Sequence, residues 1–134
     1  MQIIVADTAG FCFGVKRAVD QAYEAVKNSN KPIYTLGPLI HNPQVVEDLN
    51  QKGVKVIHNL KELADDNSVV IIRTHGVPKS DYEYLEQRGI DFIDLTCPYV
   101  KKIHNIVHKA YKAGQGIIIV GDKNHPEVIG INGW

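Results

Sequence analysis

The sequence predicts an α/β protein built on a mainly parallel β-sheet, and three observations support this class. Apolar, strand-like runs alternate with segments whose apolar residues recur at helical spacing. Most of these runs are apolar throughout rather than alternating, which is typical of parallel strands covered by helices on both faces. A block containing a cysteine occurs twice along the chain, and this predicts repeated β-α modules.

The first half of the chain is expected to alternate strands with helices. Asn42 is a suitable N-cap and Pro43 suits the first position of a helix, so a helix should begin there. In order, the expected elements are a strand Ile3–Ala6, a helix over about 14–27, a strand Pro32–Leu36, a helix from Pro43 to near Gly53, and a strand Val54–Ile57.

The second half repeats this alternation. Ser80 and Glu83 match a capping box, Gly89 stands where a C-terminal cap belongs, and Pro98 marks a first helical turn. The expected elements are a short helical turn Leu60–Ala64, a strand Val69–Ile72, a helix over about 80–89, a strand Ile90–Leu95, a helix from Pro98 to about Lys112, and a strand Gly116–Val120.

Composition narrows the class of protein. The 134 residues are 44% hydrophobic and 22% charged, as in ordinary globular domains, and the formal net charge is zero. Nothing in this balance indicates a nucleic-acid or membrane-surface partner. No apolar run approaches the roughly 20 residues of a membrane span, and the N-terminus does not resemble a signal peptide. We therefore expect a cytoplasmic protein, whose two cysteines are thiols or metal ligands rather than a disulfide.

The duplicated block carries its cysteine and a histidine with it. Cys12-Phe-Gly-Val-Lys-Arg near the start corresponds to Cys97-Pro-Tyr-Val-Lys-Lys later in the chain. His41 follows the first cysteine by 29 positions and His125 follows the second by 28, each close to a proline. This spacing predicts two modules, residues 1–89 and an incomplete second module 90–134, whose equivalent residues face one site.

Distinctive polar residues follow the predicted strands. Since ligands bind beyond the carboxyl ends of strands in parallel sheets, these residues are expected to line one cleft. They are Cys12, His41, Arg73-Thr-His75-Gly76, Thr96-Cys97 and Asn124-His125-Pro-Glu127.

Each candidate residue has a structural alternative. Helix N-termini favour the negative charge of thiolates, which bind metals, yet free cysteines are often small buried hydrophobes. Histidines could bind a metal or an anion such as phosphate, or simply occupy surface turns. Glu127 could donate a proton, or serve as a first-turn glutamate. His104 and His108 have the spacing of a helical metal pair, but we expect them on a solvated helix face.

Five ordered motifs resemble the family of 4-hydroxy-3-methylbut-2-enyl diphosphate reductases, also called LytB, from the first residues to the last. The motifs are Ala9-Gly-Phe-Cys12-Phe-Gly-Val15, Gly37-Pro-Leu-Ile-His41-Asn-Pro43, Arg73-Thr-His75-Gly76, Leu95-Thr-Cys97-Pro98 and His125-Pro-Glu127-Val128.

The resemblance implies the last step of the non-mevalonate isoprenoid pathway, in which two electrons and protons remove an allylic hydroxyl. It implies three similar α/β modules around a cleft, each giving one cysteine to a 4Fe-4S iron–sulfur cluster. Cys12 and Cys97 would be cluster ligands, while His41, His75 and His125 would hold the substrate diphosphate. Glu127 would donate a proton, and ferredoxin or flavodoxin would supply electrons.

The chain departs from this family pattern by stopping at Trp134, so we expect an N-terminal fragment that is inactive alone. Two alternatives stay open. In the first, Cys12, Cys97 and two of the three histidines bind zinc for a hydrolase. In the second, the chain is a non-catalytic phosphate-binding module.

Overall fold

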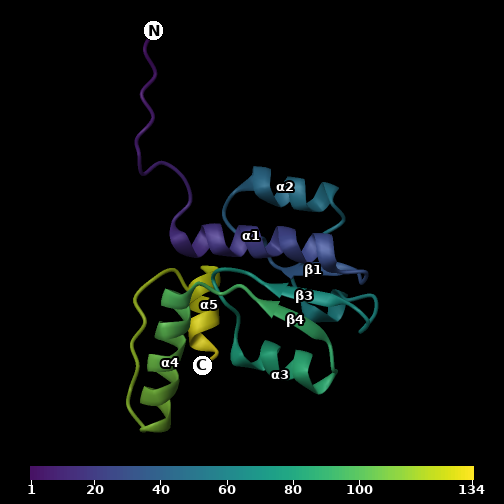
Figure 1. Cartoon of the computed structure of the whole chain (residues 1–134). Helices are drawn as coiled ribbons and strands as arrows, with labels where there is room; N and C mark the ends of the chain where they lie inside the picture. The colour runs from purple at the N-terminus through teal and green to yellow at the C-terminus, as the bar shows by residue number, and fades with distance from the viewer.

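A four-stranded parallel sheet forms the centre of the protein (Figure 1). The computed structural model describes residues 1–134. The strands are β1 (Ile33–Leu36), β2 (Lys55–Ile57), β3 (Val69–Ile72) and β4 (Asp91–Asp94), in the spatial order β2-β1-β3-β4. All neighbouring pairs are parallel, with Ile33 opposite Val69 and Val69 opposite Asp91. The predicted parallel α/β class is confirmed.

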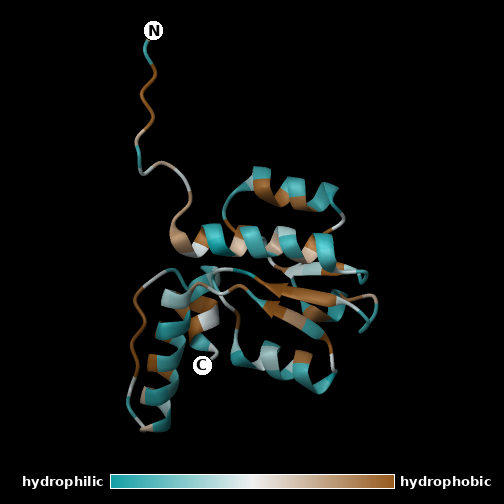
Figure 2. Cartoon of the chain, viewed as in Figure 1, coloured by the Kyte–Doolittle hydropathy of each residue, from teal (hydrophilic) through white to brown (hydrophobic).

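Helices cover both faces of this sheet. Helices α1 (Phe13–Asn28) and α2 (Pro43–Gln51) lie on one face, and α3 (Lys79–Gln87) with the short 3-10 helix η1 (Leu60–Glu62) lies on the other (Figure 1). Successive residues of β3 point to opposite faces, so Ile71 enters the first core and Ile72 the second. Burial on both faces explains why β1 and β3 contain no exposed residue, as the apolar strands of Figure 2 illustrate.

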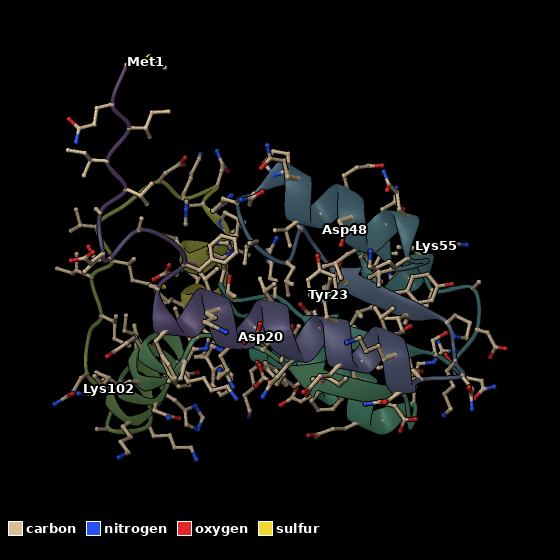
Figure 3. All side chains as sticks on the ribbon, turned by 45° about the horizontal axis from the view of Figure 1, so that its top comes forward. Met1, Asp20, Tyr23, Asp48, Lys55 and Lys102 are labelled. Carbon is tan, nitrogen blue, oxygen red and sulfur yellow. The ribbon has the colours of Figure 1, made fainter.

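A side-chain hydrogen bond also connects helices α1 and α2. The Tyr23 hydroxyl of α1 donates a 2.5 Å hydrogen bond to the Asp48 carboxylate of α2, and Figure 3 shows both residues between these helices. Helix α4 (Pro98–Lys112) and helix α5 (Pro126–Asn132) pack against each other beside the sheet. No helix has both the length and the apolar character that a membrane span requires.

Several local predictions about helix ends are confirmed. The Asn42 side chain accepts hydrogen bonds from the backbone of Gln44 and Val45 and so caps α2, with Pro43 as its first residue. Cys97 is the N-cap of α4 and Pro98 its first residue. Gly89 follows α3 with φ of +64°, a left-handed conformation that suits glycine.

Two predicted strands are wrong. Ile3–Ala6 and Gly116–Val120 form no strand, and their apolar side chains are exposed except for half-buried Ile119. The exposed fractions are 82% for Ile4, 91% for Ile118 and 94% for Val120. Figure 2 shows the N-terminal segment extending away from the body as an apolar stretch. A strand needs a neighbour to satisfy its backbone groups, and the four-stranded sheet provides none to either segment.

The expected equivalence of the two repeats is therefore only partial. Both copies run from a cysteine at a helix N-terminus to a second helix whose first residue is proline, but only the first copy has a strand between its helices. Strand β4 pairs with β3 in the same sheet, although the predicted second module begins at residue 90. The division of the chain at residue 89 stays a prediction.

Two further expectations fail. Helix α3 begins after Pro78 and has no side-chain cap, so Ser80 and Glu83 do not form a capping box. His104 does not lie on a solvated face, because its side chain is only 2% exposed. The face of α4 that is turned inward contains Val100 and His104, while Ile103 and Ile106 are exposed. Packing against α5 and Trp134, rather than hydropathy, therefore sets the orientation of this helix.

Candidate functional site

Hydrogen bonds join the loops that follow three strands of the sheet. The backbone N–H and the side-chain hydroxyl of Thr74 both donate to the Leu39 carbonyl, at 3.2 and 3.1 Å. The Cys97 N–H in turn donates to the Thr74 carbonyl at 2.9 Å. Leu39 follows β1, Thr74 follows β3 and Cys97 follows β4. The carboxyl ends of these strands are thus held together, which positions the residues next to them.

Three histidines converge at this edge of the molecule. The ring centroids of His41 and His75 are 4.4 Å apart, those of His41 and His125 are 5.9 Å apart, and those of His75 and His125 are 5.8 Å apart. We call these residues the imidazole triad. They come from the loop after β1, the loop after β3 and the start of α5. The three histidines therefore lie close together, as expected from the sequence.

Within the imidazole triad, the His75 ring is not protonated at neutral pH. Burial, together with the positive charges that His41, Arg73 and His125 can carry, lowers the pKa of His75 to about 4. The Nδ1 atom of His75 is buried without a hydrogen-bond partner. A neutral His75 next to the half-buried Arg73 favours the approach of an anion, which supplies compensating negative charge.

Arg73 provides that neighbouring cation. Its guanidinium lies against Gly37, where a Cβ atom would come within 2.1 Å of Nη1, so this position accommodates only glycine. Gly37 also has φ of +76°. Burial lowers the pKa of Arg73, and the charge of Asp81 partly offsets that effect. The guanidinium nevertheless stays charged at neutral pH, because its ordinary pKa lies above 12.

His125 and Glu127 are linked through the first turn of α5. His125 is the N-cap of this helix, and its Nδ1 atom accepts a 3.2 Å hydrogen bond from the Glu127 backbone N–H. The neutral ring therefore carries its proton on Nε2, which can donate to a ligand. Both side chains are half-buried. Glu127 thus follows closely on one member of the imidazole triad.

The two cysteines begin two helices that touch each other. Cys12 is the exposed N-cap of α1 and Cys97 is the half-buried N-cap of α4, and both thiols are free. A Cβ atom built on Gly14 would lie 2.8 Å from the Cys97 sulfur. The Arg17 guanidinium also donates to the Thr96 carbonyl at 2.9 Å. The two helix N-termini are therefore close together, although Ile3–Ala6 forms no strand before Cys12.

The six predicted residues thus fall into the imidazole triad with Glu127 and a pair of helix starts with Cys12 and Cys97. The Thr74–Cys97 hydrogen bond connects the two sets. The side chains form no group of three or more histidine, cysteine, aspartate or glutamate residues that could hold a metal ion. This arrangement does not support the zinc alternative, which requires four of these ligands together.

Sequence reasoning missed Arg17 and Trp134 near the site, and it assigned His104 to a solvated face. His104 stacks on Trp134, with ring centroids 5.1 Å apart and an interplanar angle of 20°. The Trp134 indole N–H donates to the Val77 carbonyl at 3.2 Å. The one available signal was the i, i+4 spacing of His104 from Val100, the apolar residue that shares its buried face.

Comparisons with known proteins agree on one family. The family model described as "LytB protein" matches residues 3–134. The 4-hydroxy-3-methylbut-2-enyl diphosphate reductase of Caldanaerobacter subterraneus subsp. tengcongensis is 58% identical over 137 residues, which cover 100% of this chain and 47% of that protein. The reductase of the same name from Clostridioides difficile is 46% identical and is covered to 48%. The chain spans about half the length of the curated relatives it matches.

Two solved structures share the fold. One is described as the structure of (E)-4-hydroxy-3-methyl-but-2-enyl diphosphate reductase, the terminal enzyme of the non-mevalonate pathway. It is 50% identical with a TM-score of 0.81, and the match covers 98% of this chain and 46% of that chain. The other is the E-1-hydroxy-2-methyl-but-2-enyl-4-diphosphate reductase of Plasmodium falciparum. It is 35% identical with a TM-score of 0.88, covering 95% of this chain and 40% of that chain.

Proposed function

This chain belongs to the LytB family, and we propose that it forms the N-terminal part of a 4-hydroxy-3-methylbut-2-enyl diphosphate reductase. The reaction breaks the allylic C–O bond of the substrate, consumes two electrons and two protons, and releases water. The products are isopentenyl and dimethylallyl diphosphates. The observation that carries the proposal is the convergence of three imidazoles from distant parts of the chain, with Glu127 two residues from one of them.

The imidazole triad binds the diphosphate group of the substrate in this proposal. Three imidazoles within 6 Å of one another can direct several N–H donors at the oxygens of one anion. The charged guanidinium of Arg73 lowers the pKa of His75 and attracts the same anion. Binding the part of the substrate that does not react would fix the orientation of the part that does.

Glu127 acts as the proton donor to the leaving hydroxyl. A hydroxide is a poor leaving group, and a proton delivered during C–O cleavage converts it to water. Glu127 is half-buried, and its backbone is tied to the His125 ring. A residue anchored in this way can hold its carboxyl group near a substrate whose diphosphate contacts His125.

Cys12 and Cys97 would provide two ligands to an iron–sulfur cluster. Both are free thiols at helix N-termini, and both are reachable from solvent. When bound, such a cluster supplies the two electrons and a Lewis acid for the hydroxyl group. Two thiolates are fewer than a cubane cluster needs, so residues beyond these 134 would complete its ligand set. Ferredoxin or flavodoxin is the electron donor in this proposal.

Exposed apolar segments support completion by further residues. Ile3, Ile4 and Val5 are 73 to 82% exposed, and Ile118 and Val120 are more than 90% exposed. Unpaired apolar segments of this kind are able to pair as strands of a sheet. Leaving their apolar side chains exposed to water costs free energy. The part of the relatives that this chain does not span is large enough to supply such a sheet.

The test is reduction of 4-hydroxy-3-methylbut-2-enyl diphosphate by the complete protein after chemical reduction, with iron counted in the same sample. We expect both diphosphate products by mass spectrometry. Iron-loaded protein that yields neither product would contradict the proposal.

A second candidate, a non-catalytic phosphate-binding module, is favoured by one observation: the imidazole triad contains no cysteine and is already assembled. It predicts that Cys12→Ser and Cys97→Ser together leave diphosphate binding intact while the wild-type protein also shows no reduction. Calorimetry with inorganic diphosphate, run beside the reduction assay, separates the two functions.

A further inference from the structure

His104 is a buried histidine with no role in the chemistry proposed above. Its side chain is 2% exposed, and its Nε2 atom has no hydrogen-bond partner. A buried polar atom without a partner reduces stability, and an apolar residue of similar size avoids that cost. Stability alone therefore gives no reason for a histidine at this place in α4.

The ring of His104 lies directly against the backbone that carries His75. A Cβ atom on Gly76 would be 2.5 Å from Cε1 and 3.3 Å from Nε2 of His104. Gly76 has φ of +71°, and its N–H donates to the Arg73 carbonyl at 3.0 Å. This hydrogen bond closes the turn Arg73–Gly76, in which His75 is the third residue. The position of Gly76 therefore determines where the His75 ring is presented.

The same turn is held from its other side by α5. A Cβ atom on Gly130 would contact the His75 carbonyl oxygen at 3.4 Å and the Gly76 backbone at 3.5 Å. Helix α5 also carries His125 at its N-cap. The turn Arg73–Gly76 thus lies between the His104 ring and the helix that presents another member of the imidazole triad. A shift of His104 would change the spacing between His75 and its partners.

We propose that His104 is a positioning residue, which holds the turn Arg73–Gly76 through its contact with Gly76 and thereby sets the His75 ring within the imidazole triad. Trp134 supports the other side of this arrangement, since it stacks on His104 and donates from its indole to the Val77 carbonyl, one residue after Gly76. For its kinetic readout this inference rests on the proposed function. Its structural readout does not.

The test compares three variants of the complete protein. His104→Met and His104→Gln both replace the ring that lies against Gly76 with a flexible chain, the first apolar and the second polar. His108→Gln is the matched control, because His108 also contacts Trp134, with ring centroids 6.1 Å apart and Nδ1 3.2 Å from the Trp134 carbonyl oxygen. The atoms nearest to a Cβ on Gly76 belong to His104 and Thr96, so His108→Gln should affect Trp134 only.

We expect His104→Met to raise KM for the diphosphate substrate about tenfold or more, with kcat and iron content within about threefold of wild type. Its Tm should equal or exceed that of the wild type, because an unpartnered polar atom has been removed. His104→Gln, which also lacks the ring, should raise KM similarly, and His108→Gln should keep wild-type KM. A wild-type KM for either His104→Met or His104→Gln would overturn the proposal.

Histidine nitrogen-correlated NMR spectra give the structural readout without any assay of reduction. His104→Met should shift the ring resonances of His75 and leave those of exposed His58 unchanged. Unchanged His75 resonances would refute the positioning role even in a protein that reduces no substrate. If His104→Met shifts the His75 resonances but the wild type has no reductase activity, the positioning role is supported and the proposed function is rejected.

If His104→Met fails to fold, Gly76→Ala tests the contact from the other side. The added Cβ would meet the His104 ring at 2.5 Å and should displace the same turn. In a double variant with His104→Ala, which provides space, Gly76→Ala should have a smaller effect on the His75 resonances. Such non-additivity is expected for residues in contact. Strictly additive shifts would contradict the proposal.

Discussion

The sulfur of Cys97 lies over the backbone of Gly14, so closely that a Cβ atom at residue 14 would be 2.8 Å from it. Gly14 is buried in the first turn of α1, two residues after Cys12. The contact brings the start of α1 against the start of α4, and it depends on the missing side chain of one glycine. It therefore connects the spacing of the two cysteines to a single residue that can be substituted.

Gly14→Ala should displace the Cys97 thiol and lower the iron content of the complete protein to less than half. A real Cβ contact this short does not persist, and alanine also favours the helix by up to about 1 kcal/mol, so stability should change little. Gly116→Ala is the control, because no atom lies within 4 Å of its added Cβ. Iron analysis beside thermal unfolding checks both variants. Equal iron in Gly14→Ala and wild type would show that this contact does not matter.

Cys12→Ser and Cys97→Ser should each weaken or abolish an iron–sulfur cluster in the complete protein. A neutral hydroxyl is a poor ligand for iron compared with a thiolate. Visible absorption and counts of iron and sulfide measure the outcome. Full iron and full activity in both variants would remove the cysteines from the cluster assignment.

Glu127→Gln should retain the cluster and bind substrate but lose turnover by a factor of about 100 or more. The amide has the same shape as the carboxyl group and no proton to give. Its backbone N–H, which donates to His125, is unaffected by the change. Single-turnover reduction with iron counted in parallel measures the effect, and wild-type turnover would exclude Glu127 as the proton donor.

Diphosphate binding should be accompanied by proton uptake at His75. Its pKa of about 4 lies well below the usual 6.5, so the ring is neutral at pH 7, and a bound anion raises the pKa again. Affinity should therefore increase as the pH falls from 8 towards 6. Calorimetry in two buffers of different ionisation enthalpy measures the uptake, and His75→Gln should take up fewer protons. Equal uptake by both proteins would contradict this role.

The lowered pKa of His75 also predicts the direction in which the stability of the protein changes with pH. Below pH 6.5 the unfolded chain protonates its histidine first, while native His75 stays neutral until about pH 4. His75 therefore lowers the stability of the protein as the pH falls from about 6.5 to about 4, and adds no further change below that. Urea unfolding across this range should show a shallower pH dependence for His75→Gln than for wild type.

Asn42→Ala should lower the free energy of unfolding by about 1 kcal/mol, the usual loss for an N-cap. Asn42 accepts hydrogen bonds at 3.1 and 3.2 Å from the first turn of α2. It also follows His41 directly, so the frayed helix start should weaken diphosphate binding as well. Asn42→Asp, which keeps the capping oxygen, should behave like the wild type in urea unfolding. An alanine variant of unchanged stability would show that the cap contributes nothing.

Local signals in the sequence succeeded where the controlling interaction lies within a few residues. The caps at Asn42 and Cys97 and the left-handed Gly89 depend on local backbone geometry, and all are found as expected. The buried strand Val69–Ile72 is also a local signal, since four β-branched apolar residues in succession are typical of a strand covered on both faces.

Signals that depend on a partner did not succeed. Ile3–Ala6 and Gly116–Val120 have the residues of strands, yet a strand also needs a neighbour for its backbone groups, and hydropathy does not reveal whether one is available. His104 has the polarity of a surface residue, and its burial follows from the contacts with Gly76 and Trp134, residues distant from it in the sequence.

The sequence by itself determined the parallel α/β class, the helix starts at Asn42 and Cys97 and the residue types that gather at the strand ends, because these depend on propensity, capping and order along the chain. Only the tertiary structure decided that His41, His75 and His125 meet within 6 Å, that Cys97 rests on Gly14, and that His104 supports the turn of His75. Those contacts join residues 28 to 84 positions apart, and their distances depend on how whole elements pack, which no local pattern of residues encodes.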